Sequence, residues 1–239
     1  MLKNLIKTFQ NLFNQGNLLD KKTNPGSHSY VDHGYLGVNN FLWRQKESYG
    51  GFEGLEDTIK TIIGITENME LTENSMTLYR GTNAVLFPEL ENAESGTLVP
   101  LRGITSTATD FKMANYFTEN NPRALSEVKP LIFKINVDKN KPHYKVDNIS
   151  EGEKEVILPP AIYEIASVSN INGVKVVEMN QKELLDIENL ILDGLHHINE
   201  NIEDYNKIKA HHIENLRKRV LNFYNHMEKN NNKSKQKNQ

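Results

Sequence analysis

The chain has no cysteine, one tryptophan and no long apolar run. Without cysteine it can form no disulfide, no thiolate zinc site and no cysteine nucleophile. No segment reaches the roughly 18 consecutive apolar residues that a membrane-spanning helix needs, so we expect no span. The net charge of -3 over 239 residues gives no overall attraction to nucleic acid or to a membrane. Any such attraction has to be local.

The first residues predict an amphipathic helix. Apolar residues recur at helical spacing from Met1 to Phe13, and Lys3 and Lys7 interrupt them. A signal-peptide core would be an unbroken apolar run, so the pattern favours a docking helix over residues 1–22 and no signal peptide. We therefore expect a protein of the cytoplasm, or one delivered into a host cell's cytoplasm by a route that the sequence does not record.

The central part, residues 23–180, predicts one α+β domain. Helical spacing covers residues 30–46, 55–63 and 111–117, and β-type patterns cover 76–79, 97–99, 104–107, 131–137, 156–158, 162–168 and 174–177. Most of the helices come first and most of the strands later, without regular alternation. This order is typical of an α+β fold and not of a doubly wound sheet.

The C-terminal part predicts a helical extension over residues 181–228 and a disordered basic tail over 229–239. From Glu183 to Asp204 there are seven acidic residues and no Lys or Arg, whereas Lys207 to Lys237 has nine basic and two acidic residues. This segregation fits an antiparallel hairpin whose halves attract each other. The alternative is a basic surface for nucleic acid or for an acidic protein.

The stretch from Glu151 to Pro160 places acids at every second position before an apolar β-type run. Side chains alternate along a strand, so Glu153 and Glu155 point the same way, and both carboxylates can act on one substrate centre. Glu151 with Glu153 is an alternative pairing. Glu153 with Glu155 is preferred because the apolar run starts directly after Glu155. A solvated edge strand with protective charges is the non-functional interpretation.

Two further stretches carry candidate binding groups. Arg80 ends an apparent strand beside Gly81, where a guanidinium offers bidentate bonding to phosphate and a glycine lets a ligand approach the backbone. Ser106 and Thr107 lie in a hydroxyl-rich strand before a helix. The Thr109 or Asp110 side chain that follows is suited to cap that helix.

Three short motifs follow one another in the chain: Tyr79-Arg80-Gly81, then Ser106-Thr107, then Glu153-x-Glu155 followed by Val-Ile-Leu-Pro-Pro. In this order they resemble the arginine-serine-glutamate class of mono-ADP-ribosyltransferases. The class includes bacterial toxins, phage enzymes and vertebrate ecto-enzymes, and the resemblance covers about residues 30–177. It implies an α+β fold of two packed, roughly perpendicular β-sheets with the substrate NAD in the cleft between them. The helix 35–42, which contains Asn39, is similar to the helix that flanks the NAD site in this family.

The resemblance implies a role for each motif residue. Glu155 would stabilise the positive charge that develops on the ribose as nicotinamide leaves, and Ser106 would orient Glu155. Arg80 would bind the NAD phosphates. Glu153 would position the acceptor and take up its proton, and in this family a Glu here accompanies arginine as the target.

Further NAD contacts are implied for Gly81, Thr107 and Asn39. In the family, a loop over the phosphates and nicotinamide often carries an aromatic residue and an arginine, which Phe117 and Arg123 match in order. The sequence departs from the family at Ala108, where the Ser-Thr-Ser motif has its last hydroxyl, and before Glu153, where no aromatic residue stands. The missing aromatic residue before Glu153 bears on which protein is the target more than on the reaction.

The implied activity is transfer of ADP-ribose from NAD to an arginine of a target protein. From the habit of the family, we expect an effector that acts on another cell, as a toxin does, or on a phage host. Three alternatives stay open: an NAD glycohydrolase with water as acceptor, a transferase acting on nucleic acid through the basic tail, and a non-catalytic binding or virion module. No metal is expected, since the pairs His196-His197 and His211-His212 lack a ligand spacing.

Overall fold

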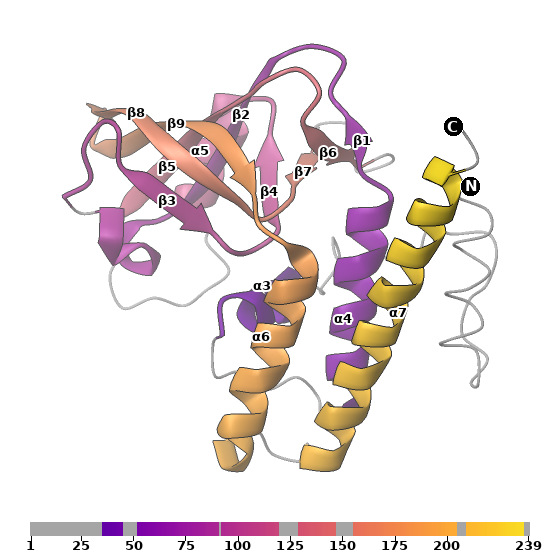
Figure 1. Cartoon of the computed structure of the whole chain (residues 1–239). Coiled ribbons are helices and arrows are strands. Elements are labelled where there is room, and N and C mark those ends of the chain that lie inside the picture. The colour runs from indigo at the N-terminus through magenta and orange to yellow at the C-terminus, as the bar shows by residue number, and fades with distance from the viewer. Residues whose placement is uncertain are drawn as a thin grey trace. The chain divides into compact units, whose positions relative to one another are not determined.

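The computed structural model describes residues 35–44, 52–90, 92–119, 129–146, 155–204 and 209–236. The chain divides into two compact units. The helical unit comprises residues 1–64 and 186–239, and the β unit comprises residues 65–185. Figure 1 shows the elements of both. The predicted helix over residues 1–22 lies outside the described residues.

The helical unit joins segments from the two ends of the chain. Its helices are α3 (Tyr35–Leu42), α4 (Phe52–Glu67, whose last residues belong to the β unit), α6 (Ile187–Glu200) and α7 (Ala210–Gln236), with the 3-10 turn η4 (Ile202–Asp204). The Asp186 carboxylate begins α6 by accepting a hydrogen bond from the Asn189 amide at 3.1 Å. The predicted C-terminal helical hairpin is confirmed, because α6 and α7 pack along each other.

Apolar stripes bury the helices of this unit against one another, as the helical spacing predicted. Their fully buried members include Leu55, Ile59, Ile191, Leu195, Leu216 and Val220. Gly194 of α6 lets the ring of Phe41 from α3 approach closely, since an added Cβ would lie 2.7 Å from that ring. Arg219 of α7 donates a hydrogen bond to Glu56 of α4 at 3.0 Å. These contacts tie α3 and α4 to the C-terminal helices.

The β unit contains a nine-stranded sheet in the order β1-β6-β7-β4-β2-β5-β9-β8-β3. The strands are β1 (Glu70–Leu71), β2 (Met76–Asn83), β3 (Leu98–Leu101), β4 (Thr105–Ala108), β5 (Pro130–Val137), β6 (Pro142–Lys145), β7 (Glu155–Leu158), β8 (Ala161–Ile171) and β9 (Val174–Leu184); the short turns η2 (Ala84–Leu86) and η3 (Pro88–Leu90) follow β2. Neighbouring strands are antiparallel except β5 and β9. The predicted α+β class is confirmed.

One residue pair, Tyr79 with Ala108, joins β2 to β4. This narrow joint divides the nine-stranded sheet into one part of β1, β6, β7 and β4 and another of β2, β5, β9, β8 and β3. No apolar pattern in the sequence predicted β1 or β6. Both are short, β1 having two residues and β6 starting at Pro142, so neither shows an alternating apolar pattern.

A long hairpin of β8 and β9 forms one side of the β unit. Asn172 and Gly173 make its two-residue turn with φ of 52° and 85°, the left-handed conformations that a type I′ turn requires and that Asn and Gly adopt most readily. The sequence predicted shorter strands and a helical region from residue 181, but β9 continues to Leu184. Cross-strand pairing with Ala161 and Ile162 overrides the weak strand preference of Lys182 and Glu183.

Helix α5 (Phe111–Glu119) covers one face of β2 and β5. The Asp110 carboxylate caps it by accepting a hydrogen bond from the Lys112 amide at 2.7 Å, as predicted for this position. Ala114 packs with Ile132 and with Tyr79 on the covered face. Since side chains alternate along β2, Arg80 points to the opposite face.

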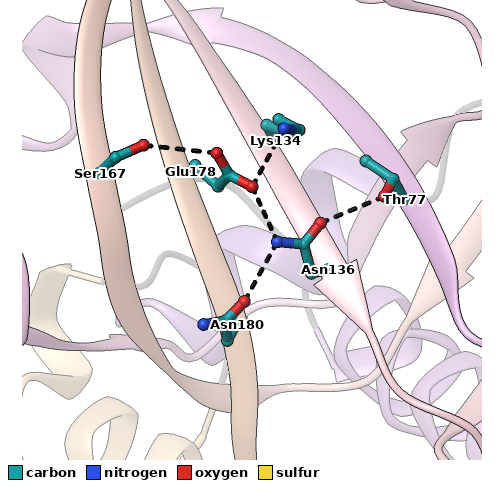
Figure 2. A network of polar contacts seen from close by, with 6 residues as sticks. All are labelled: Thr77, Lys134, Asn136, Ser167, Glu178 and Asn180. Atoms are coloured by element: carbon teal, nitrogen blue, oxygen red, sulfur yellow. Dashed lines mark hydrogen bonds and ion pairs between the residues drawn. The ribbon is translucent and has the colours of Figure 1, made fainter.

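A network of polar side chains crosses four adjacent strands on this covered side of the sheet (Figure 2). Its centre is Asn136 of β5, which donates to Glu178 at 3.0 Å and to Asn180 at 3.1 Å, both on β9. Lys134 forms an ion pair with Glu178 at 3.0 Å. Thr77 of β2 donates to Asn136, and Ser167 of β8 donates to Glu178. The network fixes the parallel register of β5 and β9.

The C-terminal tail requires a correction. The sequence predicted disorder from residue 229, whereas α7 continues to Gln236. The Lys, Asn, Ser and Gln residues there include no Pro or Gly, and each residue added to an existing helix gains a backbone hydrogen bond without a new nucleation cost.

Candidate active site

Three adjacent strands, β7, β4 and β2, carry the residues that the sequence singled out. Glu155 is the first residue of β7, Ser106 lies in β4 and Arg80 in β2. They are far apart in the chain but fall on neighbouring strands because β4 pairs with both β7 and β2. All three are partly exposed. The structure therefore gathers a guanidinium, a hydroxyl and a carboxylate in one region of the β unit.

Ser106 and Glu155 share one face of the β4–β7 pair. Ala108 lies directly opposite Glu155, and Ser106 lies two residues before Ala108. Residues two apart in a strand point the same way, so the two side chains are diagonal neighbours with Cβ atoms about 7 Å apart. A glutamate side chain is long enough to reach a serine hydroxyl over that diagonal. The predicted contact is thus compatible with the register.

Arg80 reaches across from β2 to β4. Its Nη1 donates a hydrogen bond to the backbone carbonyl of Ser106 at 3.2 Å, and this bond is partly buried. The guanidinium is thereby held at the backbone of Ser106. A planar cation held by its inner edge can offer its remaining donors to an anionic group such as a diphosphate.

Gly81 and Thr107 have roles inside the sheet. A Cβ at Gly81 would lie 1.7 Å from the Ala114 carbonyl oxygen, so this glycine admits α5. From its place beside Arg80 we expected Gly81 to admit a ligand. The buried Thr107 hydroxyl donates to the Val156 carbonyl at 2.6 Å and ties β4 to β7. These contacts explain both residues without a substrate, and NAD binding by either stays a prediction.

Four other residues were predicted to belong to the site: Phe117, Asn39, Glu153 and Arg123. Phe117 lies in α5 with 39% of its surface exposed, against the ring of Tyr116. Asn39 belongs to α3 of the helical unit, where it is buried. Glu153 and Arg123 lie outside the described residues. The NAD contacts assigned to Phe117, Asn39 and Arg123, and the acceptor role assigned to Glu153, stay predictions.

The fold and this arrangement agree with a comparison to known families. A sequence model described as ADP-ribosyltransferase exoenzyme matches residues 10–194, well over half of the chain. The chain belongs to the ADP-ribosyltransferase exoenzyme family. The arginine-serine-glutamate resemblance drawn from the motifs is thereby confirmed at the level of the family, and the activity of the family is ADP-ribosyl transfer.

Solved structures of ADP-ribosyltransferase toxins have a similar fold. Vis toxin from Vibrio splendidus is 20% identical with a TM-score of 0.54, covering 76% of this chain and 85% of that chain. The same enzyme in complex with agmatine gives a TM-score of 0.53 at the same identity and coverage. C3larvin toxin from Paenibacillus larvae is 16% identical, with a TM-score of 0.47, over 69% and 88% of the two chains. A comparison with curated protein sequences gave no match.

For this ADP-ribosyltransferase, the described residues contain no group of three or more His, Cys, Asp or Glu side chains that could hold a metal ion. None of the described helices combines the length and apolar composition needed to cross a membrane.

Nothing supports a nucleic-acid acceptor. Two of the basic C-terminal residues form ion pairs within the helical unit: Arg219 pairs with Glu56, and Lys218 pairs with Glu214 at 3.9 Å.

Sequence reasoning missed two polar residues of the β unit, Tyr163 and Gln181. Tyr163 is fully buried and Gln181 is 3% exposed, and both lie among apolar residues of β8 and β9. A signal was present: the inward positions of β8 are Ala161, Tyr163 and Ile165, so a tyrosine occupies a position that the alternation assigns to the core.

Proposed function

We propose that the protein is a mono-ADP-ribosyltransferase that uses NAD as donor and an arginine of a target protein as acceptor. The observation that carries the proposal is the bond from Arg80 to the Ser106 carbonyl, in a sheet whose register puts Ser106 beside Glu155. The arrangement supplies a phosphate-binding cation and a carboxylate for an electron-poor ribose. Membership of the exoenzyme family makes NAD the fitting donor.

The proposed reaction breaks the bond between nicotinamide and the ribose carbon. Nicotinamide leaves with the bonding electrons, so positive charge develops on the ribose, and Glu155 stabilises that charge more in the transition state than in the ground state. A guanidine nitrogen of the target then bonds to the ribose carbon and gives its proton to Glu153. Ser106 orients the Glu155 carboxylate, and Arg80 holds the diphosphate.

Arginine as acceptor rests on two supports. One is the acid two residues before Glu155, because a carboxylate attracts a guanidinium and accepts its proton. The other is that a protein of similar fold, Vis toxin, has a structure in complex with agmatine, a small guanidinium compound. A guanidinium acceptor on a protein is therefore the best-supported target chemistry, and an effector acting inside another cell is the biological setting we infer.

The decisive experiment incubates the purified chain with labelled NAD and a cell lysate, and separately with agmatine. The wild type should label protein, form ADP-ribosyl-agmatine and release nicotinamide. Glu155→Ala should lose all of these, because removing one preorganised charge-stabilising group costs on the order of 3 kcal/mol or more, about a hundredfold in rate.

Glu153→Gln separates transfer from NAD cleavage. Transfer to protein and agmatine should vanish, whereas hydrolysis of NAD should largely persist, because water needs no guanidinium site. Equal loss of both activities would refute the division of roles between the two acids. Free ADP-ribose as the only wild-type product would show a glycohydrolase instead.

A further inference from the structure

Two buried polar side chains of the β unit lack partners in the part of the chain that the structure describes. They are the Tyr163 hydroxyl and both polar atoms of the Gln181 amide. Tyr163 of β8 and Gln181 of β9 are directly paired across the two strands. Buried polar groups in native proteins are nearly always hydrogen-bonded, because each one left without a partner destabilises the fold. An adjacent pair therefore calls for a shared partner.

The pair lies on the same face of the sheet as Arg80. Arg80 is level with Phe133 of β5, which is level with Val177 of β9. Val177 and Gln181 are four residues apart on β9, so both point to this face, opposite α5. The long side chains of Arg80, Tyr163 and Gln181 thus lie on the same face of the sheet.

The chemistry of the pair is complementary to a guanidinium. Arginine carries five N–H donors and no acceptor, whereas the tyrosine oxygen and the glutamine carbonyl are acceptors. Burial raises the pKa of Tyr163, and the positive charge of Arg80 acts against that rise, which agrees with a guanidinium close to the hydroxyl. Arg80 itself already spans from β2 to the Ser106 carbonyl of β4.

We propose that Tyr163 and Gln181 are positioning residues for Arg80. Their buried oxygens accept hydrogen bonds from a buried water that the inner edge of the guanidinium also contacts, so that its outer edge faces the substrate diphosphate. This inference rests on the proposed function, in which Arg80 binds NAD. It assigns the pair to substrate binding and not to the chemical step.

The test measures KM for NAD and kcat of NAD cleavage in Tyr163→Phe and Gln181→Met. Each variant removes acceptors while keeping most of the side-chain volume. KM should rise about tenfold, the usual effect of losing a hydrogen bond to a charged group, with kcat within about twofold of the wild type. The double variant with Arg80→Lys should show no additional loss from Tyr163→Phe, because the partner of the hydroxyl is already changed.

Ile165→Val is the matched control. Ile165 is fully buried on the same face of β8, two residues from Tyr163, so the substitution trims the core without touching a polar group. It should lower the melting temperature and leave KM unchanged. If Tyr163→Phe and Gln181→Met also leave KM unchanged, the pair only fills the core and the proposal is overturned.

A second measurement does not depend on activity. In protein labelled with ¹⁵N-arginine, the Arg80 side-chain signal, assigned by its loss in Arg80→Lys, should report an ordered guanidinium in the wild type and a mobile one in Tyr163→Phe. Equal order in both proteins would overturn the proposal. If the wild type does not cleave NAD, the proposed function fails, while this signal still decides whether the pair orients Arg80.

Discussion

Gly81 lies between Arg80, which precedes it in β2, and Ala114 of α5, which packs against it. It follows Arg80 in β2, and its missing side chain admits the backbone of α5 at Ala114. The helix therefore packs directly on β2, the strand that carries Arg80. The position of that strand depends on the glycine, although the glycine faces away from the guanidinium.

We predict that Gly81→Ala strongly destabilises the β unit. The new methyl group would lie 1.7 Å from a backbone oxygen, which no side-chain rotation can relieve, so α5 has to move. We expect a loss of about 3 kcal/mol or more in the free energy of unfolding, as for a severe overpacking mutation. Denaturant unfolding followed by backbone circular dichroism measures this free energy.

Gly96→Ala is a useful comparison, because no atom lies within 4 Å of its added Cβ. Gly96 has a φ of 87°, so alanine there tests backbone strain without a clash. It should cost about 1 kcal/mol. A loss at Gly81 no larger than this would show that α5 adjusts freely.

At this scale the sequence indicates candidate chemical groups but not how their neighbours pack. Arg80, Ser106 and Glu155 were recognisable by residue type and order. The same reasoning placed Gly81 and Thr107 at the substrate, whereas the structure gives them packing and strand-pairing contacts. A glycine or a threonine beside a functional residue shows no sign in the sequence of which face it serves.

Among the elements, the parallel pair of β5 and β9 depends on polar side chains. Glu178 receives hydrogen bonds or ion pairs from Asn136, Lys134 and Ser167. These contacts, with the Asn136 bond the largest, hold the pKa of Glu178 below its usual value of 4.5. The charged form is therefore favoured in the folded state.

We predict that the network makes stability depend on pH in the acid range. A carboxyl whose pKa is lowered by folding stabilises the protein above its unfolded pKa, and this contribution is lost as pH falls through the folded pKa. Glu178→Gln should therefore be less stable than the wild type at pH 7, by about 1 kcal/mol after solvent screening. The difference should shrink below about pH 4.5 and disappear in stronger acid.

Urea unfolding at several pH values measures this effect, and Glu164→Gln provides the control. Glu164 also pairs with one lysine, Lys182, at 2.9 Å, but the pair is more exposed. Exposed pairs contribute about 0–1 kcal/mol, so the control should change little at any pH. A difference between Glu178→Gln and wild type that persists unchanged into acid would contradict the electrostatic explanation.

Most elements were predictable from apolar spacing. The helices α3, α4 and α5 and the strands β2, β5 and β7 lie where the patterns placed them, within a few residues. The boundaries of β9 and the helical continuation of α7 were not, because they depend on pairing partners or on helix propagation. Local sequence records neither.

For the molecule as a whole, the grouping of segments differs from their order in the chain. From the sequence, α3 and α4 were expected in the catalytic domain and the C-terminal helices in an extension. The structure packs α3 with α6 and joins α4 to α7 through Glu56 and Arg219. The C-terminal helices are therefore part of a unit that contains both ends of the family match, residues 10–194.

We predict that the C-terminal helix is needed for the stability of the helical unit. Phe223 of α7 is 3% exposed, so Phe223→Ala should cost about 3–5 kcal/mol there. Hydrogen exchange of the α6 and α7 amides would detect the loss. Glu214→Ala, at an exposed position of the same helix, should have little effect.

Removal of residues 207–239 is accordingly a poor test of nucleic-acid binding, because it also strips apolar groups from this core. Replacing exposed basic residues such as Arg217 tests the charge alone. Similar losses in Phe223→Ala and Glu214→Ala would show that α7 is not packed as described.

The Asn172-Gly173 turn also bears on how the chain acquires its structure. It connects the two longest strands through the shortest possible loop, so their ends meet at almost no entropic cost, whereas β5 must find β9 across more than 35 intervening residues. The hairpin is thus suited to form early during synthesis or refolding. It would then offer an edge onto which the slower, long-range parallel contact assembles.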